Sequence, residues 1–227
     1  MQSSAAAKVL PLVSGSPAAS LPAVRDAVSR IVRGAVIAVP TDTIYGLACS
    51  AHCDDAVKQL YHIKKRVTTN PVAICVADIS DIYKWCHVTV CQQLLQHLLP
   101  GQVTLVFERL DSLNKNLNPA SRTIAVRIPD SDFVRNVCRE SAHPLALSSA
   151  NISASESCLT VHEFSALWPL IDRVYDGGPL HQQDPLRLGS TIVDLSAPGQ
   201  FTIRRTGCAH SAVLKVLSQF HLSPKPD

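Results

Sequence analysis

Short apolar runs, each too brief for a buried helix, recur along this chain of 227 residues and predict buried strands. They lie at 35–39, 72–76, 103–107, 123–128 and 145–148. Further short strands are expected near Val174, at 192–193 and at 201–203. Segments with helical periodicity lie at 20–32, 54–63, 90–99, 132–137, 160–168 and 211–220. Because strands and helices do not alternate strictly, the pattern predicts a mixed sheet rather than a purely parallel one.

The length and the 46% share of hydrophobic residues predict one α/β domain with a full core. Ser20 before Leu21-Pro22 predicts a helix start, so we expect a flexible leader over residues 1–19. The domain should then span 20–222, followed by a flexible tail at 223–227. No internal repeat and no second domain are recognisable.

Charge, cysteines and hydropathy limit the class of protein. The net charge is only +3 and the basic residues are dispersed, which does not indicate a dedicated nucleic-acid surface. The eight cysteines lack zinc-type spacing and no secretory signal is present, so reduced structural thiols are expected. No apolar stretch approaches the ~20 residues that span a bilayer. We expect a cytoplasmic protein, and the acid-free leader leaves a mitochondrial pool open.

Three polar stretches suggest a site for a phosphate-bearing substrate. The predicted strand 35–39 ends abruptly in Pro40-Thr41-Asp42-Thr43, and such strand ends often carry function. Lys64-Lys65-Arg66, with Asn70-Pro71 behind it, supplies cations. The turn Ser148-Ser149-Ala150-Asn151 supplies neutral hydrogen-bond donors.

Each of these residues, taken alone, also has a simpler explanation. Lys64 at a helix end would complement the helix dipole. Arg127 would lie on a solvated strand face, and Ser149 and Asn151 would only form a turn. The order of the motifs along one chain favours the functional reading.

Seven motifs carry a resemblance to a known family. They are PTDTIYGL at 40–47, Lys64-x-Arg66 with Asn70-Pro71, LLPGQVTLV at 98–106, TIAVRIP at 123–129, SSANIS at 148–153, GSTIVDLS at 189–196 and IRRTG at 203–207. The chain resembles the YrdC family of threonylcarbamoyl-AMP synthases, most closely the animal members, over about residues 20–220. The resemblance implies a twisted mixed sheet around a central cleft, with flanking helices.

The family resemblance also implies a reaction. L-threonine and bicarbonate give an N-carboxylated threonine, whose new carboxylate attacks the α-phosphate of ATP and releases pyrophosphate. Mg²⁺ is expected to accompany ATP, with the phosphates supplying most of its ligands. The product would pass to a tRNA threonylcarbamoyl-transferase complex, and direct tRNA binding is expected to be weak.

The matching motifs imply roles for individual residues. The catalytic group would be Lys64, Arg66, Ser149 and Asn151. The ATP-binding group would be Arg66, Asn70, Thr123, Ser149, Asn151, Ser157 and Arg205. The threonine pocket would comprise Thr43, Arg127 and Ser190, with Arg127 holding the carboxylate bidentately.

Departures from the family pattern and rival functions accompany this assignment. Cys75 stands where many relatives have a histidine, and Thr206 replaces a proline usual after the arginine matched by Arg205. Arg204 beside it makes the register ambiguous. The alternatives are a binding module for structured or double-stranded RNA without catalysis, and an inactive scaffold in the transferase assembly.

Overall fold

The computed structural model describes residues 8–12, 17–65, 71–151, 156–180 and 186–226, without the side chains of 17–20. Its helices are α2 (Pro17–Val32), α3 (Asp54–Ile63), α4 (Ile79–Trp85), α5 (Gln92–Leu98), α6 (Asp132–Ser141), α7 (His210–Gln219) and the 3₁₀ helix η1 (Val161–Leu170). Its strands are β1 (Val9–Pro11), β2 (Ile37–Val39), β3 (Gly46–Ser50), β4 (Ala73–Cys75), β5 (Cys86–His87), β6 (Val103–Arg109), β7 (Thr123–Arg127), β8 (Leu145–Ser149), β9 (Arg173–Asp176), β10 (Thr191–Asp194), β11 (Gln200–Arg205) and β12 (Ser223–Pro224).

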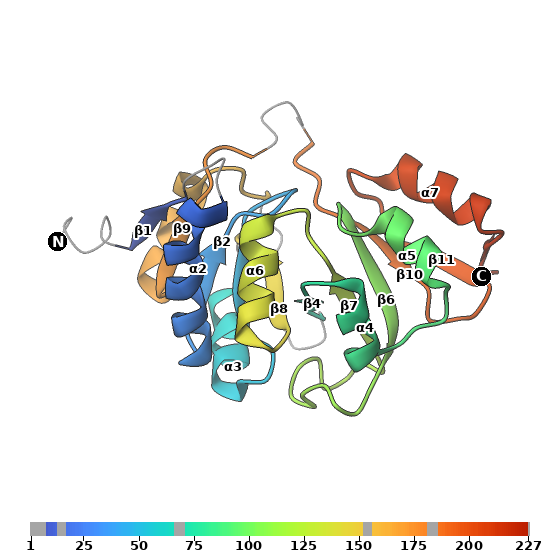
Figure 1. The fold of residues 1–227 in the computed structure, drawn as a ribbon, viewed down its shortest axis with the longest axis horizontal. Coiled ribbons are helices and arrows are strands. Elements are labelled where there is room, and N and C mark those ends of the chain that lie inside the picture. The colour runs from blue at the N-terminus through green and yellow to red at the C-terminus, as the bar shows by residue number, and fades with distance from the viewer. Residues whose placement is uncertain (1–7, 13–16, 66–70, 152–155, 181–185, 227) are drawn as a thin grey trace.

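Within the described residues, one continuous sheet runs through the molecule in the order β1-β9-β2-β3-β8-β4-β7-β6-β10-β11-β12, and β5 pairs with β6 (Figure 1). The pairs β2–β3, β3–β8, β4–β8 and β6–β7 are antiparallel, whereas β4–β7 and β6–β10 are parallel. The predicted mixed α/β sheet with flanking helices is therefore confirmed.

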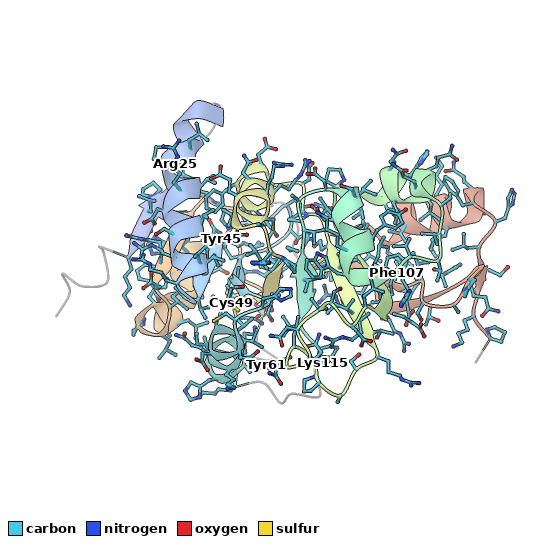
Figure 2. All side chains as sticks on the ribbon, turned by 60° about the horizontal axis from the view of Figure 1, so that its bottom comes forward. Arg25, Tyr45, Cys49, Tyr61, Phe107 and Lys115 are labelled. Atoms are coloured by element: carbon cyan, nitrogen blue, oxygen red, sulfur yellow. The ribbon has the colours of Figure 1, made fainter. Side chains whose placement is uncertain are left out.

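Two helices cover one face of the sheet, but only over part of its width. α2 and α6 lie side by side (Figure 1), and they form one apolar cluster with residues of β2, β3, β8, β9 and the end of β4. A second, larger cluster joins α3, α5, α7 and η1 to the opposite face of the sheet. Tyr45 and Phe107 lie in the interior of the molecule (Figure 2) and belong to this larger cluster.

Side chains alternate between the two faces of the sheet along β6 and β7, and those on the uncovered face line a cavity. Leu105 and Phe107 of β6 point into the larger core, as do Ile124 and Val126 of β7. Their neighbours in sequence point to the other face because successive side chains of a strand alternate. That face of β4, β7, β6 and β10 is lined by Ala73, Thr104, Val106, Thr123, Ala125, Ile192 and other residues of a cavity.

Both predicted domain boundaries need correction. Val9–Pro11, expected in a flexible leader, pairs with Val174–Asp176 of β9, and Leu12 N–H donates to Asp176 O at 2.7 Å. α2 begins at Pro17 rather than after Ser20, in keeping with proline at the first helical position and the helix propensity of Ala18-Ala19. Ser223–Pro224, expected in the tail, pairs with β11.

Other elements agree with the sequence in type but differ in detail. α4 and β5 were not predicted. The predicted helix 160–168 is the 3₁₀ helix η1, whose N-cap residue Thr160 makes no side-chain cap hydrogen bond, while Glu163 accepts one from Leu159 N–H. All eight cysteines are free thiols, as expected. No helix in the described part of the chain is long and apolar enough to cross a bilayer.

Candidate active site

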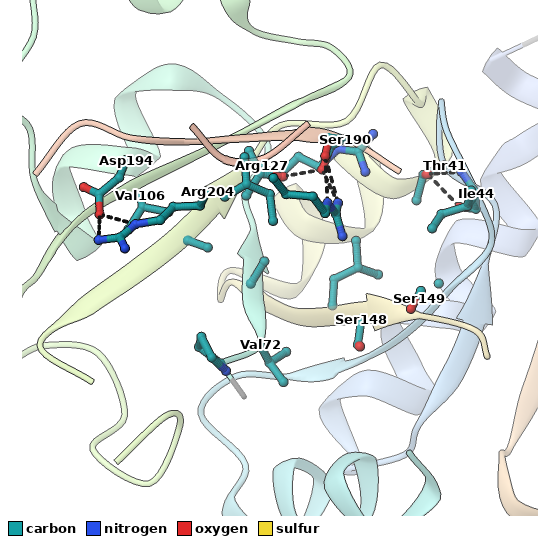
Figure 3. A pocket seen from close by; sticks show the side chains of 18 of the residues that line it. Thr41, Ile44, Val72, Val106, Arg127, Ser148, Ser149, Ser190, Asp194 and Arg204 are labelled. Atoms are coloured by element: carbon teal, nitrogen blue, oxygen red, sulfur yellow. Dashed lines mark hydrogen bonds and ion pairs between the residues drawn. The ribbon is translucent and has the colours of Figure 1, made fainter. Parts of the chain in front are cut away.

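A cavity of about 410 Å³ lies on the uncovered face of the sheet (Figure 3). Its volume falls within the range usual for small-molecule sites. Polar side chains line it together with apolar ones. The polar and charged members are Thr41, Thr104, Thr123, Arg127, Ser148, Ser149, Ser190, Asp194, Arg204 and Arg205.

The turn between β2 and β3 presents the first group. The hydroxyl of Thr41 accepts hydrogen bonds from Thr43 N–H at 3.1 Å and Ile44 N–H at 3.2 Å, and it donates to Ile44 O at 2.7 Å. A threonine side chain that closes its own turn in this way fixes the backbone locally. The turn thereby holds its remaining side chains toward Arg127.

Arg127 is the charged centre of the site. Its Nη1 donates to Thr43 Oγ1 at 3.0 Å, and its Nη2 forms an ion pair with Asp42 Oδ1 at 2.5 Å. Both side chains of the pair are buried, with 7% and 9% exposed. Arg127 Nε is buried and has no hydrogen-bond partner among the described residues. The structure thus confirms that Arg127 and Thr43 lie together, and it adds Asp42, which the sequence analysis did not assign.

Ser190 forms the second group, next to Arg205. The hydroxyls of Ser190 and Thr104 lie 2.7 Å apart, and Arg205 Nη2 donates to Ser190 O at 2.8 Å. A Cβ on Gly207 would lie 2.4 Å from backbone atoms of Gly189 and Ser190, so only glycine permits this close approach. The backbone segments that carry Ser190 and Arg205 are therefore in close contact.

Lys64 holds the turn that carries Ser149 and Asn151. Its ammonium donates to Ser149 O at 2.5 Å, to Asn151 Oδ1 at 3.1 Å and also to Asn151 O. The lysine is 2% exposed and does not line the cavity. The role of Lys64 as a cation for phosphate stays a prediction. The contacts of its ammonium with residues 149 and 151 add a positioning role.

The far end of the cavity is closed by Asp194 and Arg204. Asp194 Oδ2 accepts hydrogen bonds from Arg204 Nη2 at 2.7 Å and Nε at 3.0 Å. Asp194 Oδ1 accepts from the amide and the hydroxyl of Ser196. Burial alone would raise the pKa of Asp194, but the hydrogen bonds from Ser196 and Arg204 outweigh it and lower the pKa below its ordinary value.

Most predicted site residues that the structure describes converge on this cavity. Thr123, Arg127, Ser149, Ser190 and Arg205 line it directly. Thr43 contacts Arg127, which lines the cavity. Asn151 accepts a hydrogen bond from the Lys64 ammonium, which also holds Ser149. Arg66 and Asn70 lie outside the described residues.

Ser157 and Cys75 have separate positions. Ser157 lies in an adjacent hollow of about 300 Å³ that shares Arg205 with the main cavity. Cys75 is fully buried opposite Arg127 in the β4–β7 pairing, and burial raises its pKa to about 12. At that pKa the group packs as an apolar thiol and is a poor nucleophile.

Sequence reasoning missed Asp42, Thr104, Asp194 and Arg204 as site residues. Thr104 and Asp194 each stand in a motif that carried the family resemblance, at a polar position within an apolar strand, and this was the available signal. Arg204 also stands in such a motif, IRRTG, but its direction depends on an irregularity in strand pairing that the sequence pattern does not show.

The described side chains do not form a metal-binding cluster, since no group of three or more His, Cys, Asp or Glu residues lies together there. Asp194 is the carboxylate among the described residues that line the cavity, and Arg204 already occupies it. The site is therefore suited to holding anionic groups through guanidinium groups, hydroxyls and backbone amides.

Comparison with known proteins is consistent with this geometry. The family model Sua5_yciO_yrdC, described as "Telomere recombination", matches residues 29–207. Threonylcarbamoyl-AMP synthase of Bos taurus is 48% identical over 204 residues, covering 89% of this chain and 74% of the bovine protein. The protein of the same name from Homo sapiens is 48% identical, covering 87% of this chain and 71% of the human one.

Solved structures resemble the fold. P. abyssi Sua5 complexed with L-threonine has a TM-score of 0.81 at 25% identity, covering 96% of this chain. This chain spans 62% of that structure's length. E. coli YciO has a TM-score of 0.76 at 20% identity, covering 88% of this chain and 94% of YciO. The family match and the relatives at 48% identity confirm the resemblance seen in the motifs, and this chain belongs to the Sua5/YciO/YrdC family.

Proposed function

We propose that this protein is a threonylcarbamoyl-AMP synthase, which converts L-threonine, bicarbonate and ATP into threonylcarbamoyl-AMP and pyrophosphate. One observation carries the proposal. In a chain 48% identical to mammalian proteins of that name, motif residues far apart in sequence converge on one cavity, from Thr123 and Arg127 to Ser190 and Arg205. The P. abyssi Sua5 structure with L-threonine supports the choice of amino acid.

The threonine end of the cavity would be the group around Arg127. Its guanidinium is fixed by Asp42 and Thr43, so its orientation is set before the amino acid arrives. Arg127 and Ser190 both line the cavity and would supply the donors for the amino acid's carboxylate. A carboxylate so held keeps the amino group in a constant place for the first reaction.

Two bond changes then follow at that place. The threonine nitrogen attacks the carbon of bicarbonate, a C–N bond forms, and water leaves to give the carbamate. A carbamate oxygen next attacks the α-phosphorus of ATP, the bond to the bridging oxygen breaks, and pyrophosphate departs. The protein contributes alignment and positive charge rather than a covalent intermediate. Ser149, held by Lys64, and Arg205 line the cavity, and we assign the phosphate chain to them.

Mg²⁺ would enter this site with ATP, carried mainly by the phosphate oxygens. The described side chains offer no cage for the ion, so we assign no residue to it. The mixed anhydride would be consumed by a separate enzyme that transfers the threonylcarbamoyl group to tRNA. We regard direct tRNA binding as minor, since the Lys64 ammonium is buried rather than displayed on a basic surface.

The test is pyrophosphate release by the purified protein with ATP, L-threonine and bicarbonate, omitting one at a time. We expect release to depend on all three, and labelled bicarbonate to appear in a product with the mass of threonylcarbamoyl-AMP. Arg127→Ala should abolish threonine-dependent release. Arg139→Ala is the matched control, because Arg139 also pairs with an aspartate, Asp78, but lies outside the cavity. Release that is unchanged when threonine is omitted would refute the proposal.

A further inference from the structure

We propose that Arg204, held by Asp194, binds the purine base of ATP, by covering one face of the ring and donating a hydrogen bond to its edge. This inference rests on the proposed function and assigns the base end of the same cavity. Arg204 is the binding residue, and Asp194 is a positioning residue that acts through it.

A β-bulge turns Arg204 into the cavity. Ile192 pairs with Arg205 and Val193 pairs with Ile203, so Arg204 is an extra residue on β11. In a regular strand, adjacent side chains point to opposite faces. The bulge removes this constraint, and both Arg204 and Arg205 line the cavity.

The floor of the cavity beside Arg204 is largely apolar. Asp194 pairs with Val106, and Val106 pairs with Ala125 on the next strand. The row continues through β4, where Ala73 pairs with Leu147 of β8. All of these residues line the cavity. Small side chains in register on a sheet form a surface against which a planar ring can lie, as in aromatic contacts on pleated sheets.

The guanidinium of Arg204 is held as a fixed plane. Its Nε and Nη2 bind the same carboxylate oxygen of Asp194, and the other oxygen is held by Ser196. No hydrogen bond from Arg204 Nη1 is found among the described residues, and the side chain is 61% exposed. One face and one donor are therefore available to a ligand. Guanidinium planes stack on nucleobases in this manner.

The charge of the pair favours a base over a phosphate. Arg204 and Asp194 together are formally neutral, and the lowered pKa of Asp194 keeps its carboxylate ionised at neutral pH. A phosphate placed at Arg204 would meet the negative charge of Asp194 close behind it. Arg205 differs, because it donates to the uncharged carbonyl of Ser190. Figure 3 shows Asp194 and Arg204 beside Val106, away from the end with Thr41 and Ser149.

The experiment separates the base from the phosphates. Adenosine and inorganic triphosphate are each used to displace a fluorescent ATP analogue labelled on the ribose, from wild type and from Arg204→Ala. We expect the inhibition constant of adenosine to rise about 3- to 30-fold in the variant, with that of triphosphate unchanged. Arg204→Lys, which keeps the charge but loses the plane, should behave like Arg204→Ala.

Asp194→Asn should raise the adenosine constant in the same direction, and the Asp194→Asn/Arg204→Ala double variant should be no weaker than Arg204→Ala alone. Arg139→Ala, which breaks an Arg–Asp pair outside the cavity, is the control and should match wild type. Urea unfolding of Arg204→Ala shows whether the variant is folded.

Two results would overturn the inference. One is an unchanged adenosine constant in folded Arg204→Ala; the other is a rise for triphosphate alone, which would place Arg204 on the phosphates. Either leaves the proposed function standing, provided that the wild type still releases pyrophosphate with threonine. A wild type that binds no ATP would overturn both.

Discussion

Replacing Lys64 with methionine should destabilise the protein, not only inactivate it. A lysine that only binds phosphate could be removed without loss of the fold. In the structure Lys64 is 2% exposed, and its ammonium donates to two backbone carbonyls, those of Ser149 and Asn151. Methionine retains the apolar stem of the side chain and removes the charge and all its hydrogen bonds.

The expected loss follows from those contacts. Hydrogen bonds to charged groups each contribute about 1.5–3 kcal/mol, and a buried carbonyl left without a donor costs about 1–3 kcal/mol. Removing the lysine also ends the cost of burying its charge, and water can reach part of the turn. The net loss in the free energy of unfolding should be about 2–4 kcal/mol.

Urea unfolding followed by circular dichroism measures this loss, with an expected fall in midpoint of about 1–2 M. Lys65→Met is the matched control, because the adjacent Lys65 is exposed and should unfold like wild type. Pyrophosphate release should also fall in Lys64→Met, since Ser149 would no longer be held. An unchanged midpoint would refute the positioning role and return Lys64 to the part of a ligand-binding cation.

Three further predictions concern the two ends of the cavity. Asp42→Asn removes the anionic partner of buried Arg127, so it should lower the free energy of unfolding by about 1–3 kcal/mol and raise KM for threonine more than KM for ATP in the pyrophosphate assay. Gly207→Ala places a Cβ 2.4 Å from the backbone of Ser190, so thermal unfolding should show a loss of more than about 2 kcal/mol; a wild-type Tm would contradict the close approach. Asp194 has a pKa below its ordinary 3.8 in the fold, so the stability it contributes is present above that value and is lost as pH falls through the lower, folded-state pKa. The difference in unfolding free energy between wild type and Asp194→Asn should therefore be constant near neutral pH and shrink toward pH 3; a constant difference throughout would be inconsistent with the lowered pKa.

The sequence was sufficient for the parts of this structure that depend on local pattern. The apolar runs gave β6, β7 and β8 within a residue or two, since a run of branched side chains between turn residues has few other solutions. The motifs also gave the convergence of Arg127, Ser149 and Ser190. That inference came from their shared order with a known family, and no local rule supplies it.

The remaining features depend on long-range contacts. The position of Lys64 beside residues 149–151 depends on how α3 packs against the end of β8. The direction of Arg204 depends on a bulge that strand propensity does not encode. β1 was misread as a leader because three residues at a sheet edge have little periodicity, and their pairing with β9 lies more than 160 positions away.

The sheet order has a consequence for how this protein acquires its site. β10 arrives late in the sequence but pairs with β6, beside strands formed from the first half of the chain. A nascent or truncated chain that ends before Ser190 would therefore hold the Arg127 corner but lack one wall of the hollow. Contacts of such long separation form slowly in folding. Binding of small molecules would then require the whole domain to be folded, and ligands should protect the whole domain together against heat and proteolysis.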